Sequence, residues 1–196
     1  MTAAPMLPER HDWTVDDLGD LSKEFRHESM NGRPIEPSDS PAHQDLCIEV
    51  ALALRAHCPP HLIVTIDQSL RVNRRIEARP DVVAVGMANY ATTPVPVEDA
   101  ILAVDIVSVP SEFREIVETA EVHSKAGIAT YWVLDQMRSE LSLTELILDP
   151  ARKRYSFGLH TTDVFTVTEP WPITIDLPAL SSRRTALLAR ANKPAD

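Results

Sequence analysis

The order of apolar patterns along the chain constrains its fold more than any other feature of the sequence. A helical period over residues 41–58 precedes the strand-like runs HLIVTID, SLRVN, PDVVAV and ILAVDIVSV, and a second helical period precedes TYWVLD, ELSLTELILD and RYSFGLH. The segment SSRRTALLARA has the pattern of a terminal helix. Because helices and strands follow one another in this way, we expect an α/β or α+β domain with one mixed sheet and helices packed on it.

The first helical period has clear boundaries. Ser40 before Pro41 is a typical helix start, and Pro59 with Pro60 ends the pattern. Its apolar face consists of Leu46, Cys47, Val50, Ala51 and Leu54. If the same helix includes Cys58, the two cysteines lie ~16 Å apart at ~1.5 Å per residue, which is too far for a disulfide bond. Both thiols are therefore expected to be reduced.

The second helical period, SEFREIVETAEVHSKAG, predicts a single apolar stripe and a defined end. Lys125 falls in the last turn, and Gly127 is the expected C-cap. The predicted stripe consists of Phe113, Ile116, Val117 and Ala120. Nearer the N-terminus, TVDDLGDL predicts a short helical segment and FRHESMNGRPIEP predicts a β-hairpin that turns at Asn31 and Gly32.

Length and composition indicate one globular domain over residues 1–196, with a poorly ordered N-terminus (about 1–12) and C-terminal tail (about 191–196). A chain of 196 residues can bury roughly two-thirds of its unfolded surface. No window approaches the ~20 apolar residues of a membrane span, and the first residues lack the apolar segment of a secretory signal. We therefore expect a cytoplasmic protein.

Two aspartates stand where apolar strands are expected. Asp81 follows Pro80 at the mouth of PDVVAV, and Asp105 lies in the middle of ILAVDIVSV. Since strand side chains alternate between faces and a short connection favours neighbouring strands, the two carboxylates are expected to converge on one face of the sheet. Oxygen ligands of this kind favour a hard ion such as Mg²⁺.

An ordinary structural role for each aspartate is also open. An aspartate at a strand mouth often caps a turn or pairs with an arginine such as Arg79. Asp105 is harder to explain in this way, because a mid-strand aspartate works against β-propensity. Its position therefore invites a functional explanation.

The segment RPDVVAVG together with ILAVDIVSVPSEFREIVETAEVHSKAGIATYWVLDQ resembles the Uma-type restriction endonuclease family, a bacterial branch of the PD-(D/E)XK nuclease superfamily. FRHESMNGR is similar to the hairpin of that family, and PAHQDLCIEVALAL is similar to its helix with a His-Gln pair. The resemblance covers roughly Trp13 to Leu148. It implies a restriction-endonuclease-like mixed central sheet flanked by helices, and hydrolysis of DNA phosphodiester bonds that depends on Mg²⁺ or Mn²⁺.

The resemblance also implies roles for individual residues. Glu28, Asp81 and Asp105 match the positions that hold a divalent metal, although the family usually has glutamate at position 105. His43 matches the histidine of the His-Gln pair, which we expect near the scissile phosphate; a capping or surface role is equally open for it. Many nucleases of this superfamily act as dimers, so the resemblance also raises a homodimer as a candidate assembly.

The lysine of the superfamily is absent from both places where it is expected. Val107 occupies the place two residues after the second acid, and Thr119, after Glu118, occupies the place on the following helix to which the Uma-type branch has moved it. Lys125 lies ~120° around the helix from position 119 and is a poor substitute. His123 is one turn from position 119, only ~40° away, and is a candidate catalyst or an interior histidine.

Two functional hypotheses follow from these residues. The first is a Mg²⁺-dependent endonuclease that retains its metal-binding acids and is weak because the lysine is missing. The second is a catalytically degenerate member of the family that binds nucleic acid or a protein without cleaving it. The net charge of −10 favours the second, because phosphate binding normally requires an excess of basic residues.

Overall fold

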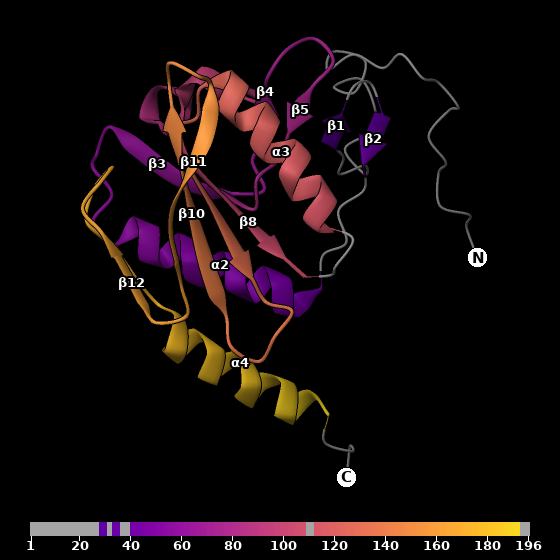
Figure 1. Ribbon diagram of the computed structural model, residues 1–196, viewed down its shortest axis with the longest axis vertical. Helices are drawn as coiled ribbons and strands as arrows, with labels where there is room; N and C mark the ends of the chain where they lie inside the picture. The colour runs from indigo at the N-terminus through magenta and orange to yellow at the C-terminus, as the bar shows by residue number, and fades with distance from the viewer. Residues whose placement is uncertain (1–27, 31–32, 36–39, 109–111, 193–196) are drawn as a thin grey trace.

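The molecule is built around one mixed six-stranded sheet (Figure 1). This computed structural model describes residues 28–30, 33–35, 40–108 and 112–192, with side chains over 40–108 and 116–192. The strands in spatial order are β11 (Arg154–Thr161), β10 (Ser142–Asp149), β9 (Thr130–Asp135), β8 (Ala100–Val107), β6 (Val82–Gly86) and β3 (Leu62–Ile66). Strands β8 and β9 are parallel, and the other neighbours are antiparallel. The expected mixed sheet is confirmed.

Helices cover the two faces of this sheet. Figure 1 shows α2 (Pro41–Arg55) and α4 (Leu177–Ala191) on one side and α3 (Glu112–Ala126) on the other. The alternation of strand side chains produces two apolar clusters: Val82, Ala84, Leu102, Val104 and Ile106 face α2, whereas Val83, Val85, Ala103 and Val107 face α3. Asp105 alternates with Val104 and Ile106, and it therefore belongs to the face that α3 covers.

A second, smaller sheet lies beside α3. Its strands in spatial order are β2 (Arg33–Ile35), β1 (Glu28–Met30), β5 (Glu77–Ala78), β4 (Leu70–Arg71) and β7 (Val95–Pro96). The antiparallel pair β1 and β2 is the hairpin expected around Asn31 and Gly32, with Met30 opposite Arg33. Ser29 of this hairpin pairs with Glu77, so the hairpin adjoins the chain segment that leads into Asp81.

Two details of the predicted helices are wrong. Helix α2 ends at Arg55, so Cys58 lies outside it; the two cysteines nevertheless form no disulfide bond, as expected. In α3, Val117 is 68% exposed, and the buried side of the helix instead includes His123 and Ser124. The reason is geometric, because positions 116, 120, 123 and 124 lie within one ~100° arc and Val117 lies outside it.

The C-terminal region contains more structure than the sequence indicated. Helix α4 begins at Leu177, capped by the side chain of Asp176, four residues before the expected terminal helix SSRRTALLARA, and extends to Ala191, the last residue of that segment. A hairpin of β12 (Val164–Val167) and β13 (Ile173–Asp176), not predicted, packs beside α2. The predicted segment TVDDLGDL and the expected N-terminal tail lie outside the described residues. None of the helices in the described ranges has the length and apolar character needed to cross a membrane.

Candidate functional site

Asp81 and Asp105 face each other across adjacent antiparallel strands. Val82 lies opposite Val104, so Asp81, the residue before β6, lies opposite Asp105 in β8. Residues opposite each other on an antiparallel pair share one face of the sheet. The predicted convergence of the two carboxylates is therefore present in the structure, at the mouth of β6.

Backbone amides tie the two carboxylates together. The amide of Asp81 donates to Oδ1 of Asp105 (3.2 Å), and the amide of Ile106 donates to Oδ2 of Asp81 (2.6 Å). The hydroxyl of Tyr131, in β9, donates to Oδ2 of Asp105 (2.6 Å). These bonds fix both side chains, and each carboxylate oxygen that accepts one hydrogen bond retains a second lone pair for another partner.

His43 approaches the pair from the first turn of α2. Its Nε2 lies 2.9 Å from Oδ1 of Asp81, and its Nδ1 lies 3.0 Å from Oγ of Ser108. The amide of Gln136 donates to the same Ser108 oxygen (2.6 Å). With the Ser108 hydroxyl donating to Nδ1, the proton of His43 is on Nε2 and points at Asp81. The geometry thus makes His43 a group that orients Asp81.

Burial, and after it the neighbouring charge of Asp81, raise the pKa of Asp105 from 3.8 to about 7, against the opposing effect of the hydrogen bond from Tyr131. Burial likewise raises the pKa of the Tyr131 hydroxyl well above its usual value, with the charge of Asp105 as the next contribution. Among the residues whose side chains are described, neither carboxylate pairs with a lysine or an arginine. The site therefore concentrates negative charge that a cation would stabilise.

Asp105→Asn should stabilise the metal-free protein at alkaline pH. The folded-state pKa of Asp105 lies above the unfolded value, so the folded protein retains a proton that the unfolded chain releases, and stability falls as pH rises from about 4 to about 7. Asparagine can accept the hydrogen bond from the amide of Asp81 through its oxygen and donate to the Tyr131 hydroxyl oxygen through its amide nitrogen, and it has no charge to bury. We expect a gain of the order of 2–4 kcal/mol at pH 8 and little change at pH 4.5.

Urea unfolding in the presence of chelator at these two pH values measures the effect. The matched control is Asp163→Asn, an equal change of charge at an exposed residue outside the site. A wild-type protein whose stability is the same at both pH values would contradict the assignment of a raised pKa to Asp105.

The candidate residues on α3 lie in different surroundings. His123 is fully buried and meets the ring of Tyr131 edge-on at 5.0 Å, and within the described part of the chain neither of its nitrogens has a hydrogen-bond partner. Burial lowers the pKa of His123 to about 4, so its ring is neutral at pH 7. It cannot replace the positive charge of a lysine, and we interpret it as a core residue that packs behind Tyr131.

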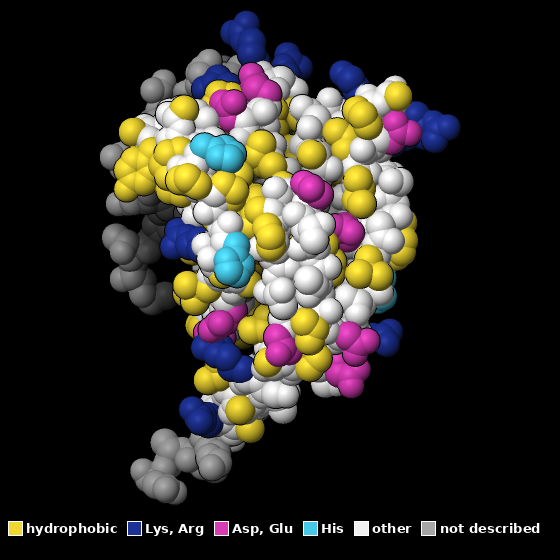
Figure 2. All heavy atoms as spheres, turned by 90° about the vertical axis from the view of Figure 1, so that its left-hand side faces the viewer, with side chains coloured by type: hydrophobic (Ala, Val, Ile, Leu, Met, Phe, Trp, Pro, Cys, Tyr) yellow, Lys and Arg dark blue, Asp and Glu magenta, His cyan; other side chains and the backbone are white. Residues whose placement is uncertain are grey.

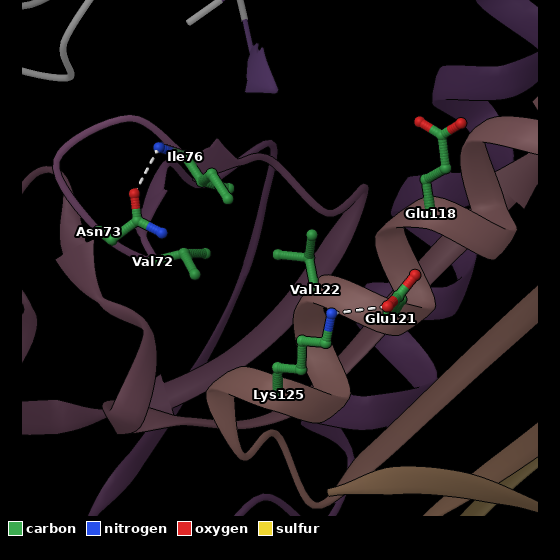
Figure 3. A pocket seen from close by; sticks show the side chains of 7 residues that line it. All are labelled: Val72, Asn73, Ile76, Glu118, Glu121, Val122 and Lys125. Atoms are coloured by element: carbon green, nitrogen blue, oxygen red, sulfur yellow. Dashed lines mark hydrogen bonds and ion pairs between the residues drawn. The ribbon is translucent and has the colours of Figure 1, made fainter. Parts of the chain in front are cut away.

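Lys125 points to the outer side of α3. Its Nζ lies 2.6 Å from Oε1 of Glu121. An open cavity of about 410 Å³ lies between α3 and the turn that joins β4 to β5. Both side chains line this cavity, as Figure 3 shows. Glu118 lines the same cavity. Thr119 is half-buried, and Val107 is fully buried beneath α3. The structure thus supports the expectation that Lys125 is a poor substitute for the missing lysine.

Other predicted residues are only partly described. Glu28 belongs to β1, but the position of its side chain lies outside the described part of the structure. Three residues that contact the site were not predicted: Tyr131, Ser108 and Gln136. Tyr131 and Asp105 meet through the register of parallel strands, in which Ala103 pairs with Tyr131 and Asp105 with Val133. That register cannot be read from spacing along the chain.

The fold is that of a restriction-endonuclease-like α/β protein. The structure is similar to a crystal structure of "a putative nuclease belonging to DUF820" from Anabaena variabilis, with a TM-score of 0.68 and 13% sequence identity over 87% of this chain and 98% of that one. The model of the Uma2 family, described as "Putative restriction endonuclease", matches residues 11–179. The chain belongs to this family. No curated protein matches it at a significant level.

Proposed function

We propose that the chain is a slow endonuclease that depends on a divalent metal and hydrolyses phosphodiester bonds of DNA. The observation that carries the proposal is the pair of facing carboxylates, Asp81 and Asp105, in a member of the Uma2 family. Neither acid pairs with a described arginine or lysine, and both are fixed by hydrogen bonds rather than free to move apart. This donor set suits a hard cation that takes oxygen ligands, Mg²⁺ or Mn²⁺.

We propose a separate role in metal binding for each residue of the site. Asp81 and Asp105 would hold the ion, and Glu28 is proposed as a third acid because its hairpin pairs with the strand before Asp81. His43 orients Asp81, and Tyr131 orients Asp105. A bound ion would polarise the scissile phosphate and lower the pKa of the attacking water.

The absence of the lysine explains why we propose a slow enzyme. In the superfamily that the chain resembles, a lysine supplies positive charge beside the scissile phosphate, and here Val107 and Thr119 occupy its two expected positions. A positioned charge of this kind is typically worth ~10²–10³ in rate. The two acids can still bind an ion without it, so the proposal predicts weak but metal-dependent cleavage.

A second candidate function is binding without cleavage. It is favoured by the missing lysine and by the net charge of −10. Figure 2 shows one face of the molecule, on which acidic, basic and apolar side chains are interspersed and no continuous basic band is visible. A DNA-cleaving protein with such a surface would need cations, or residues elsewhere on the chain, to offset repulsion from the phosphates.

Incubation of supercoiled plasmid with the purified chain separates the two candidates. We expect slow nicking with Mg²⁺ or Mn²⁺ and none with chelator. Cleavage that persists in chelator would exclude the proposed metal-dependent mechanism. DNA binding without nicking, in the wild type and also after a lysine is restored, would favour the non-cleaving candidate.

A further inference from the structure

His43, Cys47 and Asp81 form a second group of potential metal ligands on the side of Asp81 that faces α2. One ligand atom from each residue lies within 4.8 Å of the other two. His43 and Cys47 are one helical turn apart on α2, so their side chains share a face of the helix. Cys47 is only 2% exposed, whereas the side chain of Asp81 is 24% exposed and gives the group an opening to solvent.

We propose that these three residues bind a zinc-class transition-metal ion at a site that shares Asp81 with the Asp81 and Asp105 pair but takes its other ligands from α2. Thiolate and imidazole are ligands that Zn²⁺ and Co²⁺ prefer and Mg²⁺ avoids. A neutral imidazole, one thiolate and one carboxylate carry two negative charges, which balance the charge of a divalent ion and lower the cost of holding it in a buried place. Three protein ligands leave a fourth position for water.

The observed separations are close to those that such an ion needs. Tetrahedral zinc, with bonds of ~2.0–2.3 Å, places its ligand atoms roughly 3.4–3.6 Å apart. Nε2 of His43 and Oδ1 of Asp81 are 2.9 Å apart, so this pair would open slightly, and the sulfur would approach by at most roughly 1.4 Å from the 4.8 Å limit.

The contact at the other ring nitrogen of His43 is a separate observation that favours metal binding. A metal-bound histidine usually donates its other N–H to an oxygen, and Nδ1 of His43 already lies 3.0 Å from Oγ of Ser108. On binding, the ion would take the place of the proton between Nε2 and Asp81, and that proton would move to Nδ1. The thiol of Cys47 would lose its proton to solvent, so one proton is released for each ion bound.

Titration of the tag-free, full-length chain with Co²⁺ tests the site without reference to DNA cleavage. A cobalt–thiolate bond gives a charge-transfer absorption band in the near ultraviolet, which oxygen ligands do not give. The sequence has two cysteines, and Cys58 lies outside α2, so Cys58→Ala leaves Cys47 as the sole thiol. We expect the band in the wild type and in Cys58→Ala, at one ion per chain, its disappearance on adding Zn²⁺, and its loss in Cys47→Ala.

Two results would overturn the proposal. One is a natively folded Cys58→Ala protein, checked by near-ultraviolet circular dichroism, that binds Co²⁺ without a thiolate band or does not bind it. The other is a band that persists in Cys47→Ala. Because the decisive signal comes from Cys58→Ala, the test does not require the core substitution at Cys47 to fold. Nor does it depend on nuclease activity, so the two proposals can fail separately.

Discussion

Thr119→Lys should raise the rate of metal-dependent plasmid cleavage by roughly 10²–10³-fold. Helix α3 covers the face of the sheet to which Asp105 belongs, and its His123 contacts Tyr131, the partner of Asp105. Position 119 is one turn earlier on the same side of the helix, and Thr119 is half-buried. An ammonium group introduced there can extend along the helix towards the phosphate, while its aliphatic stem covers apolar surface. Nicking rates at equal protein concentration measure the effect.

The comparison needs two further variants. Lys125→Ala should leave cleavage nearly unchanged, since Lys125 pairs with Glu121 on the outer side of α3. Val107→Lys would restore the lysine at its other expected position. It is not a suitable variant, because Val107 is fully buried and an unpaired ammonium there should lower the free energy of unfolding by several kcal/mol. A Thr119→Lys protein that is folded but no faster than the wild type would show that α3 does not present position 119 to the substrate. Loss of wild-type cleavage in Lys125→Ala would show that Lys125 is the functional lysine.

Asp81→Asn should abolish cleavage, with a loss of at least roughly 100-fold. The substitution removes one of the two facing charges that would hold the ion, and an ion that polarises a phosphate supplies several kcal/mol of transition-state stabilisation, at ~1.4 kcal/mol for each factor of ten. Asparagine is nearly isosteric and can still accept the hydrogen bond from the amide of Ile106. The fold should therefore survive. The Thr119→Lys background provides a rate high enough for the loss to be measured.

Asp163→Asn in the same background is the control, because it removes the same charge from an exposed position away from the site. Its nicking rate should equal that of Thr119→Lys alone. If Asp81→Asn retained the full rate, Asp81 would be a structural residue, and the reading of an aspartate that only caps the mouth of β6 would be correct.

The sequence predicted the acidic pair because two simple rules decide its geometry. Alternation along a strand and a short connection between strands place Asp81 and Asp105 together, and both rules act locally. The helix boundary at Ser40 is local in the same sense, since the serine side chain accepts the hydrogen bond from the amide of His43. Features of this kind need no knowledge of tertiary packing.

The residues that sequence reasoning missed depend on contacts between distant elements. Tyr131 reaches Asp105 only through the parallel register of β8 and β9, and Cys47 reaches Asp81 only because α2 packs across the sheet. The error in α3 has the same origin. Its apolar residues include Val117, but the helix buries His123 instead, because the position of the sheet and not apolarity alone decides which side is covered. Such tertiary choices are invisible in a single sequence.

The most direct test of the acidic pair is a calorimetric titration of Mn²⁺ into four proteins that all carry Cys47→Ala, so that the His43 and Cys47 site does not contribute. They are this parent protein and its Asp81→Asn, Asp105→Asn and Asp163→Asn variants. Our account predicts a binding site in the parent protein that is kept in Asp163→Asn and lost, or greatly weakened, in each of the other two variants. Equal Mn²⁺ affinity in all four proteins would contradict the claim that Asp81 and Asp105 hold one ion together.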